Sequence, residues 1–441
     1  MNKLSVSLRM VFFIFMVQPL FSQTPDFAKL GRYFDVLDSA DRFMGSVAVF
    51  QNGEVIYQRS VGFADIERRL RAEALTGYRI GSISKTFTAV LVMKSVEKGK
   101  LSLEQTIDNW FPQVPNANRI TLRHLLTHRS GIHNFTDVPT YVRWNTAYKS
   151  EQQMLDTIAA QTSDFAPGTK ASYSNSGYVL LTLILQKAWG STYKALLQKY
   201  ILRPGKLKET TYGVKIDTIG IHAQSYRKVF GWWRQSITDA SVPLGAGAIS
   251  TTPVDLARFG SQLFEGKFIT KESVAEMQKL EDNIGMGLFR FPFYERWSYG
   301  HGGSIDGFQS ILSCFPKEKL TYALLSNGSA MPINDVSIAI LSAIFGKPFE
   351  IPKFIPVELS SKELELYIGT YVSKKVPVKI TVYLKDSKMY AQATGQMPFP
   401  LIAHGDHRFS YEKAGIEMNF SPQKNEMVMK QGGGSFLFSR E

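Results

Sequence analysis

Cysteine is almost absent from this sequence, since the 441 residues include a single one, Cys314. An intramolecular disulfide is therefore excluded, and with it the small scaffolds that depend on disulfides for stability. Cys314 lies in the apolar run Ile311–Phe315. We expect a buried thiol on a strand there, because a reactive cysteine needs a polar setting that stabilises its thiolate.

Long hydrophobic runs are also absent after the N-terminal region, so we expect no later segment to cross a membrane. The N-terminus carries Lys3 and Arg9 and then 11 mostly apolar residues over 10–20. This arrangement is typical of a secretory signal peptide. We expect residues 1–22 to be cleaved after Ser22, with an uncleaved anchor as the alternative, and the mature protein to be exported to the bacterial periplasm or the extracellular space.

Acidic residues are outnumbered, with 38 Asp and Glu against 51 Lys and Arg and a formal net charge of +13. A basic stripe lies between Lys199 and Arg234 and ends beside Trp232 and Trp233. Such a stripe could bind nucleic acid. An export signal argues against that partner, so we expect no nucleic-acid binding. The ordinary interpretation of such a stripe is a solvated face of the protein. As a functional interpretation, we prefer attraction to an anionic cell envelope.

The hydrophobic content of 44% and the aromatic content of 12% are enough for a substantial core and for two domains. Residues 45–59 contain two strand-type runs around Asn52-Gly53, which predicts a hairpin. Amphipathic or apolar helical patterns follow, and strand runs return over 309–315 and 321–326. We therefore expect an α+β domain over 23–347, in which helices and an all-helical subdomain flank an antiparallel sheet.

Prolines at 348, 352 and 356 mark a linker, which we place at residues 348–358. Beyond it, residues 359–441 form short alternating runs separated by turns. This pattern is typical of a small all-β barrel or sandwich. It shows no serine, histidine and aspartate constellation of its own, so we expect an accessory domain that packs beside or shields a catalytic cleft.

Ser82 and Lys85 stand three residues apart where a loop turns into an apolar helix, so their side chains are neighbours. A hydroxyl beside an amine at a helix N-terminus is a candidate activated nucleophile, although serine is also a common helix cap. The spacing alone is weak, because Ser-x-x-Lys starts at six positions: Ser82, Ser95, Ser191, Ser225, Ser410 and Ser421. Ser82 is set apart by the glycine before it together with the buried-type helix after it.

His124 and His128 have the i, i+4 spacing of a zinc-binding helix in the piece 120–131. Leu125, however, stands where a metallopeptidase of this pattern has its glutamate base. We therefore expect these histidines to cap and pack the helix, and we expect no metal.

Two further polar clusters lie at the edges of hydrophobic elements. Tyr173-x-Asn175 precedes an apolar helix, and His301-Gly302-Gly303 precedes two strand runs. Each has an ordinary structural explanation, since asparagine favours turns and glycine favours connections between strands. Glycines also allow a backbone to approach another group closely, as an edge strand that lines an active site requires.

The order Ser82-x-x-Lys85, Tyr173-x-Asn175, His301-Gly-Gly resembles the serine β-lactamase and penicillin-binding-protein superfamily. The match is to its class C-like branch, which includes D-alanyl-D-alanine carboxypeptidases, D-amino-acid peptidases and esterases. The stretches 125–131, 167–168 and 245–255 resemble that branch as well. The resemblance covers roughly residues 27 to 345, and the C-terminal segment is similar to the lipocalin-like β-domain of some such hydrolases.

This resemblance implies a β-lactamase/transpeptidase-like fold and a role for each motif. Ser82 would form an acyl-enzyme. Lys85 and Tyr173 would share the proton transfers, and Asn175 would hold Lys85 and the substrate amide. The backbone N–H groups of Ser82 and Ser304 would form the oxyanion hole.

The resemblance also implies that His301, Gly302 and Gly303 contact the substrate. β-Lactamases have lysine at the position of His301, and a mostly neutral imidazole attracts a carboxylate less strongly. We therefore expect weak β-lactamase activity or none.

The function implied is an exported serine hydrolase without a cofactor. Its substrate would be a small peptide, a peptidoglycan-derived molecule or an ester, and β-lactams are possible ligands. A D-amino-acid peptidase, a carboxypeptidase or an esterase fits best. The alternative is a penicillin-binding or peptidoglycan-sensing protein that is acylated with little turnover.

Overall fold

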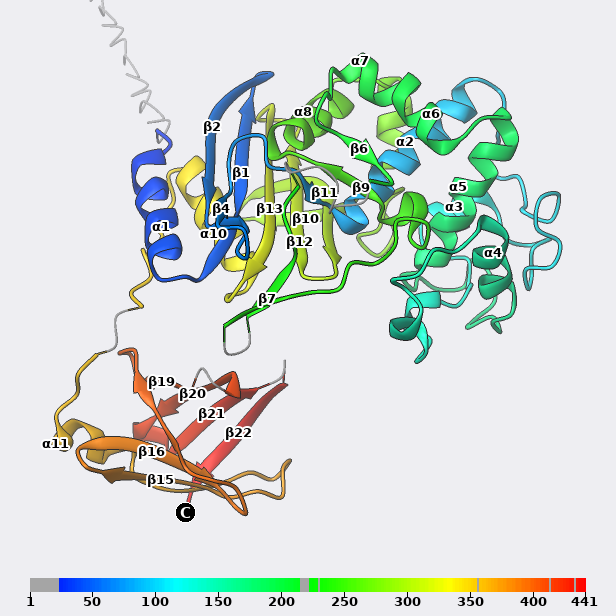
Figure 1. Ribbon diagram of the computed structural model, residues 1–441. Helices are drawn as coiled ribbons and strands as arrows, with labels where there is room; N and C mark the ends of the chain where they lie inside the picture. Colours follow the sequence, from blue (N-terminus) through cyan, green and yellow to red (C-terminus); the bar gives the residue numbers. More distant parts are fainter. Residues whose placement is uncertain (1–23, 215–221, 229–230, 355–356, 412–413, 432–433) are drawn as a thin grey trace, which may run out of the picture.

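The computed structural model describes residues 24–214, 222–228, 231–354, 357–411, 414–431 and 434–441 (Figure 1). The predicted signal peptide therefore lies outside the described residues. Within these ranges, no helix has both the length and the apolar character that a membrane span requires.

The centre of the first domain is an antiparallel sheet with the strand order β10-β11-β12-β13-β1-β2. Its strands are β10 (Phe289–Phe293), β11 (Arg296–Ile305), β12 (Phe308–Phe315), β13 (Leu320–Ser329), β1 (Phe43–Gln51) and β2 (Glu54–Val61). The predicted hairpin joins β1 and β2, and both of its turn residues, Asn52 and Gly53, have the positive φ that this tight turn requires. Cys314 is buried on β12, as predicted, and burial raises the pKa of its thiol to about 12.

Helices cover both faces of this sheet (Figure 1). On one face, α1 (Phe27–Ser39) and α10 (Ile333–Ile344) pack together over a shared apolar core. On the other face, α8 (Pro253–Phe264) packs against β1, β12 and β13. Helix α1 ends at Ser39, because Asp41 takes a positive φ and β1 begins at Phe43.

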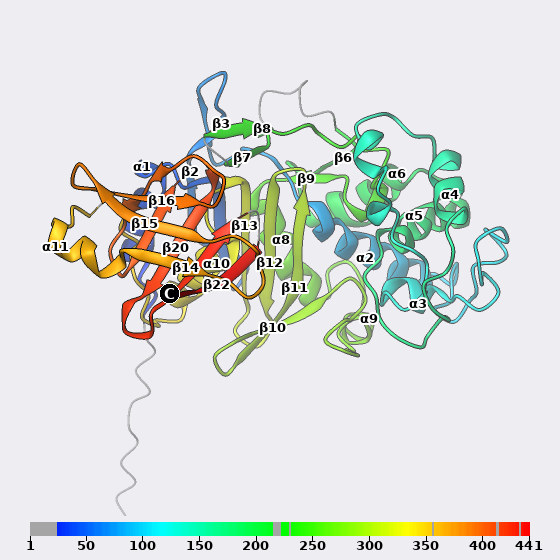
Figure 2. The same cartoon turned by 90° about the horizontal axis from the view of Figure 1, so that it is seen from below.

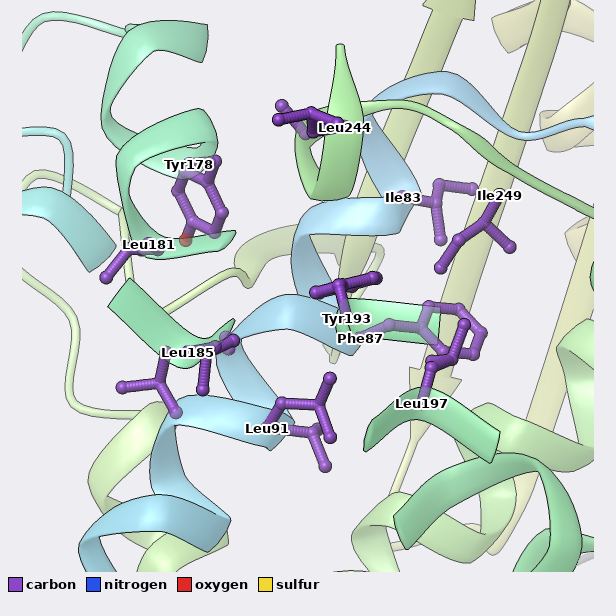
Figure 3. Packing of buried hydrophobic residues seen from close by; sticks show 14 of the residues in the cluster. Ile83, Phe87, Leu91, Tyr178, Leu181, Leu185, Tyr193, Leu197, Leu244 and Ile249 are labelled. Carbon is purple, nitrogen blue, oxygen red and sulfur yellow. The ribbon is translucent and has the colours of Figure 1, made fainter. Parts of the chain in front are cut away.

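The helical subdomain lies beside the sheet (Figure 1). It contains α2 (Ser84–Glu97), α3 (Leu122–Leu126), α4 (Glu151–Ala159), α5 (Asn175–Trp189), α6 (Tyr193–Leu197), α7 (Arg203–Gly205) and α9 (Lys271–Met277). Figure 3 shows apolar side chains of α2, α5 and α6 packed together. On another side of α2, the ring of Phe87 stacks on Phe259 of α8, with 3.6 Å between the ring centroids. Helix α2 is therefore buried between the sheet domain and the subdomain.

Short strands complete the first domain in three small ladders. They are β3 (Phe63–Asp65) with β4 (Leu70–Arg71), β5 (Tyr78–Arg79) with β9 (Ile249–Thr251) and β6 (Thr211–Tyr212), and β7 (Tyr226–Lys228) with β8 (Trp232–Arg234). The predicted basic stripe falls partly outside the described residues. In its described part, Lys228 and Trp232 both bind Asp41, so these two side chains serve internal contacts.

The C-terminal segment forms a nearly closed antiparallel barrel, with the strand order β17-β16-β15-β14-β22-β21-β20-β19-β18. The strands are β14 (Gly369–Val372), β15 (Ile380–Lys385), β16 (Lys388–Ala393), β17 (Phe399–Pro400), β18 (Ile402–Ala403), β19 (Arg408–Tyr411), β20 (Ile416–Ser421), β21 (Glu426–Gln431) and β22 (Gly434–Arg440). The first and last strands in this order are separated along the chain by Leu401 alone, so the two edges of the sheet meet there. The short helix α11 (Ser361–Leu364) precedes the barrel. Buried aromatic and methionine side chains fill the core of the barrel.

The barrel lies at the end of the molecule away from the helical subdomain in both orthogonal views (Figure 1, Figure 2). The chain that leads to it is anchored on the first domain, because Phe349, Ile351 and Phe354 pack against the core beneath α1 and α10.

We expect Phe87→Ala to lower the free energy of unfolding by about 3–5 kcal/mol, because it empties a fully buried site that a second ring covers. Denaturant unfolding followed by fluorescence measures this change. Phe291→Ala is the matched control, since Phe291 is 37% exposed. A loss below about 1 kcal/mol at Phe87 would contradict the packing described for α2.

Candidate active site

Ser82 lies in the short 3₁₀ turn η1 (Gly81–Ile83) that leads into α2. The N-cap position of α2 is Ile83, and no side chain caps this helix end. The structure therefore does not use Ser82 as a helix cap. Its Oγ instead accepts hydrogen bonds from Lys85 Nζ at 3.0 Å and from Tyr173 OH at 2.7 Å.

Lys85 is fully buried on the first turn of α2. Its Nζ donates to Ser82 Oγ at 3.0 Å, to Asn175 Oδ1 at 2.7 Å and to the carbonyl of Ala246 at 2.9 Å. These partners are neutral oxygens, so no carboxylate among them compensates the ammonium charge. Burial therefore lowers the pKa of Lys85 well below its ordinary value. A lysine with a lowered pKa is suited to accept a proton near neutral pH.

Tyr173 reaches Ser82 from the loop before α5. Its side chain is 37% exposed, but its hydroxyl points onto Ser82 Oγ, and Lys85 Nζ lies 4.9 Å from its ring centroid. Desolvation raises the pKa of this phenol, and the hydrogen bond with Ser82 offsets part of that rise. At neutral pH the phenol therefore holds its proton and acts as a donor, whereas the buried amine is the better acceptor.

Asn175 is the first residue of α5, and hydrogen bonds with Asn134 hold its side-chain amide in place. Its Nδ2 donates to Asn134 Oδ1 at 3.1 Å, and its backbone N–H donates to the same oxygen at 3.0 Å. These two contacts turn Oδ1 of Asn175 toward Lys85. Asn134 belongs to none of the sequence motifs described above, so it was missed from sequence. It is found only through its hydrogen bonds with Asn175.

The strand β11 lies directly against the nucleophile turn. A Cβ on Gly303 would lie 2.0 Å from the carbonyl oxygen of Ile80, so only glycine fits this position. Ser310 Oγ donates to the same carbonyl at 2.9 Å. A Cβ on Gly81 would lie 3.0 Å from the backbone of Ser304. These contacts bring Ser82 and Ser304 to the same cleft.

The expectation of an edge strand was wrong for β11 as a whole, because β10 pairs with it and forms the edge of the sheet. Their pairing runs only from Arg296 to Gly300. Within the described part of the chain, the segment of β11 from His301 to Ile305 therefore has no strand partner on that side. The expectation required an unpaired stretch of backbone beside the site. β11 has such a stretch because β10 is too short to pair with all of it.

His301 is buried, and its Nδ1 shares a hydrogen bond with the carbonyl of Gly302. The ring packs edge-on against Phe289, with 4.8 Å between centroids. Desolvation, together with the charge of Lys85, lowers the pKa of His301 to about 3. His301 is therefore a neutral imidazole at physiological pH and supplies no positive charge for a substrate carboxylate.

The cleft beside Ser82 has a volume of about 310 Å³. Its lining residues are Gly81, Ser82, Phe135, Thr136, Tyr141, Asn145, Asn175, Thr238, Pro243, Ala246, Gly247, Ser304, Ile305 and Asp306. Several of them come from connecting segments that carry no motif, so the sequence analysis missed them. Asp306 does lie next to the His301-Gly-Gly motif, and its charge could have singled it out. The residues that line this cleft all precede the barrel.

The two histidines at zinc-type spacing do not share a helix. His124 lies in α3, where its Nδ1 accepts a hydrogen bond from the N–H of Thr121. His128 has φ of 57° beyond the end of α3, and its ring packs against Tyr173. Each histidine thus serves the fold, in line with capping and packing. Among the residues that the structure describes, no group of three His, Cys, Asp or Glu side chains is placed to hold a metal.

Comparisons with known proteins agree with this geometry. The family described as Beta-lactamase matches residues 35–343. Penicillin-binding protein 4* of Bacillus subtilis is 26% identical over 427 residues, which cover 88% of this chain and 92% of the relative. Teichoic acid D-alanine hydrolase of Staphylococcus aureus is 24% identical over 293 residues, with 64% of this chain and 70% of the relative covered.

Solved structures show the same architecture. D-amino acid amidase from Ochrobactrum anthropi, complexed with D-phenylalanine, superposes with a TM-score of 0.65 and 26% identity, covering 72% of this chain and 99% of that one. An octameric penicillin-binding protein homologue from Pyrococcus abyssi has a TM-score of 0.67 and 24% identity. It covers 94% of this chain and 100% of that one, so the fold similarity extends into the barrel.

The matched family region contains the nucleophile turn, the helical subdomain and β11 to β13, which together build the cleft. The chain therefore belongs to the β-lactamase family and is a serine hydrolase of the penicillin-binding-protein-like type, with a lipocalin-like barrel at its C-terminus.

Proposed function

We propose that this protein cleaves a D-amino-acyl amide or ester through an acyl-enzyme on Ser82. The observation that carries the proposal is the position of Ser82 Oγ, between Lys85 Nζ at 3.0 Å and Tyr173 OH at 2.7 Å. The names of the amidase and of the D-alanine hydrolase support the substrate class, because both describe a D-amino-acyl group. The neutral His301 favours an uncharged amide or ester over a peptide that ends in a free carboxylate.

The proton transfers follow from the two pKa directions. The neutral amine of Lys85 keeps two hydrogens for Asn175 Oδ1 and the carbonyl of Ala246, so its lone pair can take the proton of Ser82 as Oγ attacks the carbonyl carbon. The backbone N–H groups of Ser82 and Ser304 stabilise the oxyanion. Tyr173 then donates its proton to the leaving nitrogen or oxygen as the bond to carbon breaks, and the proton on Lys85 replaces it. In the second half, water attacks the acyl carbon as Lys85 takes its proton, and that proton passes to Ser82 Oγ as the bond between Oγ and carbon breaks, which releases the acid and restores the serine hydroxyl.

We also propose export to the periplasm or extracellular space, where small peptides and peptidoglycan-derived or ester substrates occur. The N-terminal pattern of basic residues and a short apolar run supports this location. The net charge of +13 supports attraction to an anionic envelope surface.

We expect Ser82→Ala to abolish covalent labelling by a fluorophosphonate probe, because the attacking oxygen is removed. The measurement is in-gel fluorescence of the purified protein. Ser95→Ala is the control, since Ser95 also belongs to a Ser-x-x-Lys spacing but uses its Oγ to donate to the carbonyl of Leu91. Labelling of Ser82→Ala at the wild-type level would refute the nucleophile.

We expect kcat/KM to be high at neutral pH and to fall as the pH is lowered through the depressed pKa of Lys85, because only the neutral amine accepts a proton. Lys85→Arg should lower kcat/KM at pH 7 by at least about 100-fold, since a guanidinium stays protonated. Lys94→Arg on the same helix is the control. Activity that rises only near the ordinary lysine pKa of about 10.4 would contradict Lys85 as the base.

We expect turnover rather than a persistent adduct. Intact-mass spectra after mixing with D-alanine p-nitroanilide or a short-chain ester should return to the mass of the free protein as product forms. L-alanine p-nitroanilide and a chromogenic cephalosporin should react more slowly. An adduct that persists with every substrate would instead favour the penicillin-binding or peptidoglycan-sensing alternative, which differs only in the slow release of the acyl group.

A further inference from the structure

A second polar cluster includes two of the residues that line the cleft, Thr238 and Asp306. Arg79 Nη1 donates to Asp306 Oδ2 at 3.1 Å and to the carbonyl of Thr238 at 2.7 Å. Asp306 Oδ1 accepts from the N–H of Thr238 at 3.1 Å and from its Oγ1 at 2.7 Å. Three residues that are far apart in the sequence are thus joined by four hydrogen bonds.

Both charges of this cluster are buried, since the side chains of Arg79 and Asp306 are each 4% exposed. Removing an ion pair from water carries a desolvation penalty that the attraction between its members often does not outweigh. Asp306 also takes a positive φ of 58° at the turn between β11 and β12. Stability alone therefore gives little reason for this arrangement.

The cluster joins the segments that carry the proposed chemistry. Arg79 precedes Ser82 by three residues on the nucleophile segment, and Asp306 follows Ser304 by two residues, in the turn directly after β11. Thr238 lies on the segment that continues to Ala246, whose carbonyl accepts from Lys85. From the side of the helical subdomain, Asn145 Nδ2 donates to Thr238 Oγ1 at 3.2 Å.

We propose that the Arg79–Asp306 ion pair, clamped by Thr238, is a positioning device that fixes the separation of the two oxyanion donors, Ser82 N–H and Ser304 N–H. The two donors come from different elements, a helical turn and a strand, so their separation depends on contacts between those elements. This inference rests on the proposed function of Ser82. Arg79 does not line the cleft, and both carboxylate oxygens of Asp306 already accept from Arg79 and Thr238, so the pair acts through the backbone to which it is attached and not by touching substrate.

The chain offers a closely matched control in Asp255 of α8. Its side chain is also 4% exposed, and it pairs with Arg258 at 3.0 Å. It accepts from the N–H of Glu209 at 2.8 Å and from Thr210 Oγ1 at 3.2 Å. Asp255 thus has the same kinds of partner as Asp306, but it does not line the cleft.

The test compares Asp306→Asn with Asp255→Asn in the full chain, below their unfolding temperatures, on an ester or D-aminoacyl p-nitroanilide that the wild type hydrolyses. We expect Asp306→Asn to lower kcat about 10- to 100-fold, because a small displacement of an oxyanion donor is costly, and to change KM by less than about 3-fold. Fluorophosphonate labelling should become slower but still reach completion. Asp255→Asn should keep kcat within about 2-fold of the wild type.

A double-mutant cycle with Arg79→Gln adds a readout that general destabilisation would not produce. If the two residues act as one pair, the double variant Arg79→Gln/Asp306→Asn should lose no more kcat than the worse single variant. If Asp306→Asn does not fold, Thr238→Val decides instead, since it removes one hydrogen bond to Asp306 and should lower kcat about 3- to 10-fold without raising KM.

Each outcome has a definite meaning. The positioning role is overturned if Asp306→Asn leaves kcat unchanged, if it affects KM alone, or if Asp255→Asn loses as much kcat. Where Asp306→Asn does not fold, an unchanged kcat in Thr238→Val overturns it. Additive losses in the cycle also overturn it. Failure of the proposed function is seen separately, in a wild type that hydrolyses no substrate or in a Ser82→Ala variant that is still labelled.

Discussion

The site depends on one buried amine. Lys85 is fully buried in the described structure, and its three hydrogen-bond acceptors are a hydroxyl, an amide and a backbone carbonyl. A charged ammonium in that setting is desolvated without a carboxylate to compensate it, so the neutral form is favoured. The burial of α2 between α5 and α8 is what produces this environment. The packing of the core and the basicity of the site are therefore set by the same helix.

The neighbours of Lys85 follow from this constraint. Tyr173 cannot rely on a permanent cation to become a phenolate, and its own desolvation raises its pKa further. From sequence, we expected Lys85 and Tyr173 to share the proton transfers. In the proposed mechanism their roles differ, with the amine as proton acceptor and the phenol as proton donor. Asn175 can direct Lys85 because Asn134 holds its amide in one orientation.

Much of this arrangement could be predicted from sequence, because its determinants are local. The hairpin at Asn52-Gly53 follows from turn geometry, and Thr252 before Pro253 is a typical N-cap, whose side chain accepts from the N–H of Asp255. The cleft wall formed by Tyr141, Asn145 and Thr238 could not be found in this way. These side chains reach the cleft from loops, and their positions depend on tertiary contacts with Asp306 and Arg79. The unpaired part of β11 was missed for the same reason, because the length of β10 decides how much of β11 has a strand partner.

The charge distribution of the cleft explains why the backbone has to stabilise the reacting carbonyl. Among the lining residues of the described chain, the one formally charged side chain is Asp306, and it is already neutralised by Arg79 behind it. Before the reaction Lys85 and His301 both favour their neutral forms, and Lys85 becomes a cation only as it takes the proton of Ser82. In the proposed mechanism the fixed N–H dipoles of Ser82 and Ser304 stabilise the oxyanion, and such dipoles act over a short range that depends on their exact placement. Such a site depends on the contacts that hold the nucleophile turn against β11, and the buried Arg79–Asp306 pair, which connects the two segments, is the contact that we propose for this role.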